Sequence, residues 1–424
     1  MPEYAIILLM IAFFVVLAML FKLPIGVSLA LSAVAGSLLG GEGLSLRHLV
    51  EGSFVYFDTI ILILSAMIFM KVLEASGILD TITAHLLRTF YRRKIPFLFT
   101  VMLIIMFPGM ITGSSTTAVL SSGALVAPVL IKLGLSKQKA AALIAMGGIL
   151  GMIAPPVNIL VMIMGAGVDM PYVGFTLPLL FIVVPLAIVI SLWLGYKDIT
   201  IIKREQMMAI LPESLSRRHG FRLYLPLIVV FALMLGQNVM VKAIPDIGLP
   251  AIFLTGSLTG IFCGRHFNFL KITQKALKEA MPILSILVGV GMFIQIMTLT
   301  GARGWIVITF LSLPPLLLYL GIATSIPLFG AVSAFGSASI LGVPFILALI
   351  NKNAIITSSA LSAIAGLGDL MPPTALAGIF AAQVVGEPNY FKVLRYCIVP
   401  ALFEVLIGVA VLLLAPYLDK IILR

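Results

Sequence analysis

Long uncharged stretches dominate this chain of 424 residues and restrict what it can fold into. Hydrophobic residues make up 61% of the sequence and charged residues only 10%, against about 25% charged in a soluble globular chain. In hydrocarbon every backbone N–H and C=O group needs a partner within the protein, and only helices and closed barrels provide one. Apolar runs of about 20 residues match the length of a helix that crosses the hydrocarbon core. The composition therefore predicts an all-α polytopic membrane protein.

Ten apolar segments are predicted to be membrane-spanning helices. They are 4–21, 24–40, 53–73, 138–167, 172–196, 223–241, 248–264, 281–300, 355–385 and 396–418. Two further stretches, 96–131 and 314–350, each consist of two apolar arms joined by a Gly/Ser-rich tip. The arms are mostly too short to cross the membrane separately, so we predict that each stretch is a re-entrant hairpin.

The basic residues lie mainly in the connections between apolar segments. If both termini are outside, 21 of the 27 Lys and Arg residues fall on the cytoplasmic side, as the positive-inside rule expects. The net charge of +11 is therefore explained by the orientation of the chain in a lipid bilayer, and no nucleic-acid partner is needed to account for it. The longest polar connection, 197–222, is predicted to be a cytoplasmic connector between two halves, 1–196 and 223–424.

The two halves share one order of features. Each is predicted to hold about five spans, one of them broken at a Pro-Pro pair, and one hairpin; the broken helices are 138–167 and 355–385. Three landmarks recur at offsets of 227, 223 and 217 residues: Gly77 with Gly304, Gly113 with Gly336, and Pro155 with Pro372. An odd number of spans forces the second copy to enter the membrane upside down, which predicts two inverted repeats. The alternative is that Gly and Ser only let helices pack closely.

The hairpin tips and helix breaks are candidate ligand sites. Irregular backbone deep in a membrane is tolerated only where it is buried in protein or lines a cavity. Each Pro-Pro pair is predicted to expose the carbonyl end of one half-helix and the N-terminal end of the next, which begins near Pro155 or Pro372. Carbonyl groups suit Na⁺, and helix N-terminal ends suit a carboxylate. Paired interruptions of this kind are typical of a secondary transporter, and no ATP-binding P-loop occurs in the sequence.

Small residues, hydroxyls and one carboxylate at these positions form the predicted site. The candidate Na⁺ ligands are Ser114, Ser115, Gly148, Gly151, Gly336, Gly366, Gly368 and Asp369. The candidate substrate-binding residues are Ser115, Thr116, Asn158, Ser337 and Thr374. Asp369 is predicted to ligate Na⁺ or carry a proton, with capping of the next half-helix as the alternative. Asn158 has an equal alternative as a packing amide. Glu404 is expected to hydrogen-bond between helices, and Glu74 to face the membrane interface.

Three first-half motifs carry a family resemblance. They are Met70–Ile78 (MKVLEASGI), Gly113–Thr116 (GSST) and Gly151–Pro156 (GMIAPP). Together they resemble the large membrane subunit of TRAP (tripartite ATP-independent periplasmic) transporters, within the ion transporter superfamily. In the second half, Gly368–Pro373 (GDLMPP) is similar to that family's Gly-x-x-Thr-Pro-Pro signature, with Met371 in place of the Thr.

The resemblance implies an elevator-type, Na⁺-coupled importer of small carboxylates in the bacterial inner membrane. It implies two partners, a small four-helix membrane subunit and a periplasmic substrate-binding protein, with Na⁺ as coupling ion and no covalent cofactor. A stand-alone ion-coupled carboxylate symporter or exchanger is the main alternative, and a channel is a further one. An intramembrane enzyme is disfavoured, because all four His residues lie in or near loops and no His-Glu-x-x-His motif occurs.

Overall fold

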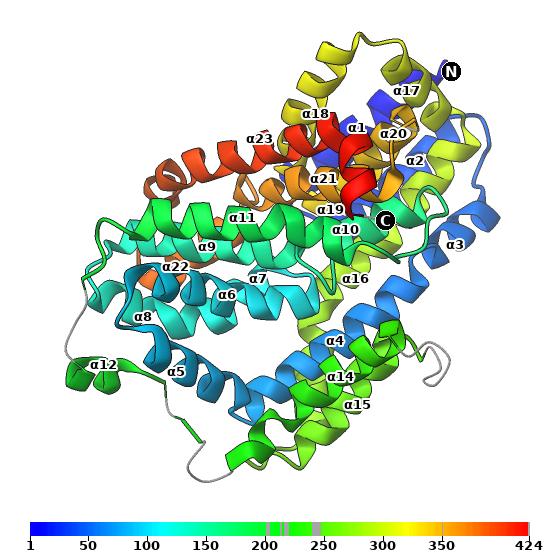
Figure 1. Ribbon diagram of the computed structural model, residues 1–424. Helices are drawn as coiled ribbons and strands as arrows, with labels where there is room; N and C mark the ends of the chain where they lie inside the picture. Colours follow the sequence, from blue (N-terminus) through cyan, green and yellow to red (C-terminus); the bar gives the residue numbers. More distant parts are fainter. Residues whose placement is uncertain (201–203, 213, 216–219, 240–246, 350, 423–424) are drawn as a thin grey trace.

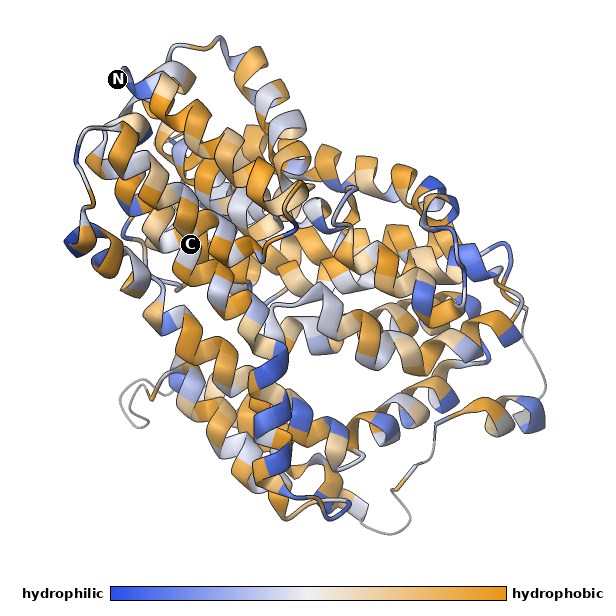
Figure 2. Ribbon diagram, turned by 180° about the vertical axis from the view of Figure 1, so that it is seen from behind, coloured by the Kyte–Doolittle hydropathy of each residue, from blue (hydrophilic) through white to orange (hydrophobic). Residues whose placement is uncertain are grey.

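The computed structural model describes the chain except for residues 201–203, 213, 216–219, 240–246, 350 and 423–424. Within the described residues every regular element is a helix (Figure 1), so the predicted all-α class is confirmed. The predicted connector 197–222, the span 223–241 and the hairpin 314–350 fall partly outside the described residues. Hydrophobic residues cover most of the helices, as in a multi-pass membrane protein (Figure 2).

The helices of the first half follow the predicted segments. They are α1 (Glu3–Met19), α2 (Ile25–Leu39), α3 (Leu46–Phe54), α4 (Phe57–Ala75), α5 (Ile78–Phe90), α6 (Lys94–Thr112), α7 (Ser115–Ala118), η1 (Val119–Gly123), α8 (Ala124–Lys132), α9 (Lys137–Ile153), α10 (Ile159–Ala166) and α11 (Thr176–Gly195). The helix α3 was not predicted, and it meets α4 at a bend of 41°.

The second half follows the same plan. Its elements, after the connector helix α12 (Arg204–Ile210), are η2 (Gly220–Tyr224), α14 (Leu225–Val239), α15 (Gly248–Ile261), α16 (Phe269–Leu299), α17 (Ala302–Leu311), α18 (Pro315–Gly330), α19 (Ala334–Ser337), η3 (Ala338–Gly342), α20 (Val343–Ala348), α21 (Ala354–Gly366), η4 (Leu367–Leu370), α22 (Leu376–Val385) and α23 (Tyr390–Ile422). Within the described residues, every predicted span overlaps one of these helices or a broken pair, and α16 and α23 extend beyond the predicted spans 281–300 and 396–418.

Some of the apolar helices are long enough to cross a membrane, and others are shorter, with 10–17 residues. Among the described residues six helices are long and apolar enough to cross a membrane, or seven if the bent pair α3–α4 counts as one. The first hairpin contributes two of them, since α6 has 19 residues and the helical stretch from Ser115 to Lys132 has 18. The prediction that the two arms are too short to cross the membrane separately was therefore wrong for this hairpin. Its tip is nevertheless enclosed by protein, because Gly113, Ser114 and Ser115 are buried and α7 packs against α9.

The helices form two groups in contact with each other. The framework helices are α1–α4 and α14–α16. Among them α2, α3 and α4 pack on the long helix α16, α1 packs on α2, α15 packs on α4, and α14 packs on α15. The hairpin group contains both hairpins, the broken helices α9–α10 and α21–α22, and the covering helices α11 and α23. In Figure 1 the framework helices α4, α14 and α15 lie at the lower right, whereas α6, α9 and α11 lie side by side across the middle.

The two hairpins have the same internal layout at a constant offset of 219 residues. In the first, the Ser114 hydroxyl accepts a hydrogen bond of 3.2 Å from the Thr117 N–H, which caps α7, and the π-helical turn η1 follows. In the second, the Ser333 hydroxyl accepts one of 3.0 Å from the Gly336 N–H, which caps α19, and the π-helical turn η3 follows. This match supports an internal repeat more strongly than the predicted landmarks do.

Two of the predicted landmark pairs were wrong. Gly336 lies inside α19, one turn beyond the position that corresponds to Gly113. The partner of Gly77 is Gly301 rather than Gly304, because Gly77 and Gly301 directly precede α5 and α17 with φ values of 75° and 74°. A positive φ favours glycine, since it has no Cβ to clash with the backbone.

The helix breaks lie later in the sequence than predicted. Helix α9 continues through its glycines to Ile153, and the next half-helix begins at Ile159 rather than near Pro155. In the second half α22 begins at Leu376 rather than near Pro372. The Val157 N–H donates to the Met110 carbonyl at 3.1 Å, and the Thr374 N–H donates to the Ala331 carbonyl at 3.4 Å. Each break is therefore attached to the hairpin of its own half.

Close contact between α2 and α16 depends on glycine. A Cβ on Gly289 would lie 2.3 Å from the Gly26 carbonyl oxygen, and a Cβ on Gly26 would lie 2.2 Å from that of Ser285. We expect Gly289→Ala to lower the thermal unfolding temperature of the purified protein, because overpacking costs about 1–3 kcal/mol. Gly304→Ala is the matched control, since a Cβ there meets open space. Equal unfolding temperatures for both variants would contradict this account of the packing.

Glu404 on α23 lacks the expected partner. Its side chain is fully buried, and among the described residues neither carboxylate oxygen accepts a hydrogen bond. The prediction that it hydrogen-bonds between helices was therefore wrong. We expect Glu404→Met to raise the unfolding temperature, because an unpaired buried polar group costs about 1–3 kcal/mol. The measurement compares Glu404→Met with Glu404→Gln, which keeps a polar group. A lower unfolding temperature for the Met variant would show that the Glu404 carboxyl group has a stabilising hydrogen-bond partner.

Candidate functional site

A cavity of about 690 Å³ lies between the framework helices and the hairpin group. Its framework side carries side chains of α4 and α16, and its other side carries the first hairpin tip, with Met152, Phe335 and Asp369 also contributing. This volume is within the range of about 300–1,000 Å³ that small-molecule sites occupy. Four carboxylates and two ammonium groups line the cavity, so its walls are formally negative.

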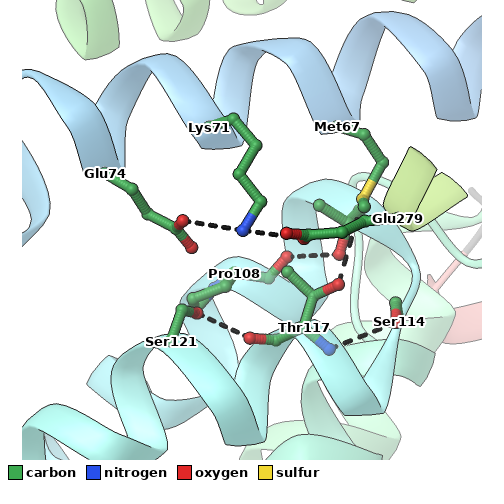
Figure 3. A network of polar contacts seen from close by, with 9 residues as sticks. Met67, Lys71, Glu74, Pro108, Ser114, Thr117, Ser121 and Glu279 are labelled. Carbon is green, nitrogen blue, oxygen red and sulfur yellow. Dashed lines mark hydrogen bonds and ion pairs between the residues drawn. The ribbon is translucent and has the colours of Figure 1, made fainter. Parts of the chain in front are cut away.

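The first hairpin tip presents hydroxyl groups to this cavity. Ser114, Ser115, Thr116, Thr117 and Ser121 all line it. The Ser121 hydroxyl donates to the Thr117 carbonyl at 2.6 Å, and the Thr117 hydroxyl lies 3.9 Å from the sulfur of Met67 on α4 (Figure 3). The π-helical turn η1 follows α7 directly and contributes Leu120 and Ser121 to the cavity lining, and such turns occur frequently at functional sites.

Asp369 joins this tip from the other half of the chain. The Ser115 hydroxyl donates a hydrogen bond to Asp369 Oδ2, although the two residues are 254 positions apart. Both side chains are buried, at 2% and 7% exposed, and both line the cavity. A buried carboxylate requires compensating partners, and hard cations bind to carboxylate, hydroxyl and carbonyl oxygens. The Ser115 hydroxyl and the Asp369 carboxylate therefore provide oxygen ligands suited to a small cation in this cavity.

The second hairpin tip has the same backbone but different chemistry. At the offset of 219 residues, Ser115 and Thr116 correspond to Ala334 and Phe335. Of the second tip only Phe335 lines the cavity within the described residues. The hydroxyl of Ser337, a predicted substrate-binding residue, donates instead to the Ile326 carbonyl at 2.7 Å inside its own hairpin. The polar chemistry of the cavity is therefore concentrated on the first tip and Asp369.

Two other predicted substrate residues lie away from the cavity. The Asn158 amide donates to the Ile153 carbonyl at 2.8 Å and to the Ser362 hydroxyl at 3.0 Å, and it caps α10. The Thr374 hydroxyl donates to the Ala331 carbonyl at 2.7 Å. Neither residue is among the described residues that line the cavity. In this arrangement the Asn158 side chain binds across the first break, and the Thr374 side chain attaches the second break to its hairpin.

The predicted glycine ligands are positions of close packing. A Cβ on Gly148 would lie 3.0 Å from the Ser115 carbonyl oxygen, and a Cβ on Gly151 would lie 2.5 Å from that of Met106. Likewise, Gly366 packs on α9, Gly368 packs on Gly330, and Gly336 lies within α19. These glycines let α9 and the second break approach the hairpins. None of the five is among the described residues that line the cavity.

Sequence reasoning missed a charged group on the framework side. The Lys71 ammonium lies 2.8 Å from Glu74 Oε2 and 2.7 Å from Glu279 Oε2 (Figure 3). The pair with Glu279 joins α4 to α16. All three residues line the cavity, so the expectation that Glu74 faces the membrane interface was wrong. A signal was available, because Lys71 lies within the predicted span 53–73, and charges within spans are rare and commonly functional.

The two tips should differ in access to water-soluble reagents. With Cys263 and Cys397, both buried, replaced by Ser, we expect Thr116→Cys to react with a membrane-impermeant thiol reagent. Ser337→Cys should stay unmodified, because Ser337 is fully buried. Labelling rates measured by mass spectrometry, with matched unfolding temperatures, provide the test. Faster labelling of Ser337→Cys would show that the second tip lines the accessible cavity instead.

The fold is similar to those of two transporters of known structure. The fold is similar to that of the YdaH transporter of Alcanivorax borkumensis, with a TM-score of 0.63 and 17% sequence identity over 92% of this chain and 98% of that chain. It is also similar to MtrF of Neisseria gonorrhoeae, described as illuminating a class of antimetabolite efflux pumps, with a TM-score of 0.59 and 16% identity over 87% and 83% of the two chains. At these identities the likeness concerns the fold alone. The comparison with curated protein sequences found no match.

A family model extends the comparison to the sequence. The model described as "Tripartite ATP-independent periplasmic transporter, DctM component" matches residues 10–418. This match confirms the resemblance carried by the first-half motifs, and it places the chain among transporters rather than enzymes. The family implies DctQ and DctP partners. The chain therefore belongs to the DctM family, the large membrane component of the tripartite ATP-independent periplasmic transporters.

Proposed function

We propose that this DctM protein imports a small carboxylate-bearing solute, driven by a Na⁺ gradient. The observation that carries the proposal is the contact between Ser115 and Asp369, which combines a hydroxyl-rich hairpin tip with a buried carboxylate at one cavity. Asp369, Ser114 and Ser115 are the proposed Na⁺ ligands. Ser115 and Thr116 are the proposed solute contacts.

The charge of the cavity walls gives a reason for cation coupling. The carboxylates of Glu74, Glu279 and Asp369 outnumber the ammonium groups of Lys71 and Lys275 on the cavity walls, so an anionic solute that enters alone is repelled. Each Na⁺ that binds with the solute removes one unit of this negative charge. Binding of cation and anion is then mutually favourable, as coupled transport requires.

We propose an elevator mechanism in which the hairpin group moves against the framework helices. The cavity at their boundary supports this division, and α5 and α17, which precede the two hairpins, would be the connecting arms. The halves 1–196 and 223–424 would be inverted repeats in the inner membrane, with both termini periplasmic. In that orientation the cavity wall around Lys71 and Lys275 is on the cytoplasmic side.

Na⁺ binding can be tested without the solute. We expect NaCl to raise the unfolding temperature of the detergent-solubilised protein more than KCl at equal concentration, because a ligand that binds only the folded state stabilises it. Ser115→Ala and Asp369→Asn should each raise the NaCl concentration needed for half of this effect by about tenfold or more. Ser339→Ala is the matched control, since the Ser339 hydroxyl donates to the Gly336 carbonyl within the second hairpin. A full Na⁺ response in Asp369→Asn would remove Asp369 from the proposed site.

Transport and partners are tested together by purification from native membranes and reconstitution. We expect a small four-helix subunit to copurify, and the complex to take up a labelled carboxylate on a Na⁺ gradient once a periplasmic binding protein is added. A single polypeptide that performs this uptake alone would support a stand-alone symporter or exchanger instead. Uptake that is indifferent to Na⁺ would contradict the proposed coupling.

A further inference from the structure

Lys71 is the more enclosed of the two cations on the cavity wall. Its side chain is 10% exposed, near the end of the largely apolar helix α4, and its ammonium lies between the carboxylates of Glu74 and Glu279 (Figure 3). An ammonium has three N–H donors, and these carboxylates occupy two. The pair with Glu74 is local, at a spacing of three residues, whereas the pair with Glu279 crosses from α4 to α16.

The two glutamates are not equivalent partners. The Glu279 side chain is 37% exposed and that of Glu74 is 23% exposed, so Glu279 is the partner that water reaches more easily. Lys275 stands four residues before Glu279 on α16 and also lines the cavity. Residues four apart on a helix are neighbours on its surface. Glu279 therefore has a second ammonium within reach and can leave Lys71 without losing a counter-charge.

We propose that Lys71 binds the carboxylate of the transported solute, and that Glu279 occupies this position while the cavity is empty. The entering carboxylate displaces Glu279, which turns toward Lys275, and Glu74 keeps its pair with Lys71. The number of carboxylates on Lys71 is the same before and after the exchange, so solute binding leaves no buried charge unpaired. The inference rests on the proposed carboxylate function, since only an anionic solute can replace Glu279.

The position of Lys71 separates its role from that of Asp369. Lys71 belongs to a framework helix, whereas Ser115 and Asp369 belong to the hairpin group. Lys71 therefore contributes to affinity and selectivity for the solute and leaves Na⁺ binding to the opposite wall. A residue that only held α4 and α16 together would affect stability and would not distinguish a carboxylate from its amide.

The test measures binding to the intact complex in NaCl. It determines the concentrations of pyruvate, succinate and malate at which binding is half-saturated, and it uses succinamide as a neutral compound for comparison. We expect Glu279→Gln to lower the half-saturating concentration of the preferred carboxylate severalfold, because the competing carboxylate is gone. The double variant Lys71→Met, Glu279→Gln should raise it about tenfold or more, the effect of losing a charge-assisted hydrogen bond. The binding of succinamide should be the same in the wild type and in every variant.

Controls separate this proposal from the proposed function. Lys278→Met changes an exposed Lys on α16 outside the cavity lining and should match the wild type. The double variant should keep the wild-type stabilisation by NaCl, which shows that it is folded and that the Asp369 site is intact. If the wild type binds none of the carboxylates, the proposed function fails. If it binds one and neither Glu279→Gln nor the double variant changes the affinity, the assignment of Lys71 is overturned.

Discussion

Backbone groups released where α9 and α21 break have no water to bind inside a membrane, and their partners determine the arrangement of the hairpin group. The Val157 N–H binds the Met110 carbonyl, and Thr374 binds the Ala331 carbonyl through its N–H and its hydroxyl. Asn158 binds both sides of the first break. These bonds attach each break to a hairpin, and through the second break they hold Asp369 where the first hairpin tip can reach it.

Small residues allow these bonds to form at such short range. Helix α6 crosses α9 where a Cβ on Gly109 would lie 2.9 Å from the carbonyl carbon of Gly151. The second hairpin approaches its break where Gly330 faces Gly368. Larger residues at these crossings would separate the helices by more than a hydrogen bond tolerates. The glycines thus act on the site through packing.

The repeated backbone carries unequal chemistry. Both hairpins have a serine cap, a short helix and a π-helical turn, yet hydroxyls line the cavity from the first tip and Phe335 from the second. Across the cavity, the framework adds its own charges through Lys71 and Glu279. The site is therefore assembled from three sources: one hairpin tip, one break from the other half, and two framework helices. Its chemistry does not follow the matching backbone of the two hairpins.

The sequence by itself determined the helical membrane class, the two hairpins, the two breaks and the family, because apolar run length, Gly/Ser tips and Pro-Pro pairs act over a few residues. It also identified Ser114, Ser115, Thr116 and Asp369, all of which line the cavity. Only the tertiary structure decided that Ser115 contacts Asp369 and that Lys71 contacts Glu279, since these pairs join distant segments. The starts of α10 and α22 and the use of Asn158 in packing were likewise decided there, because backbone groups at a break are satisfied by whichever partners long-range packing brings near.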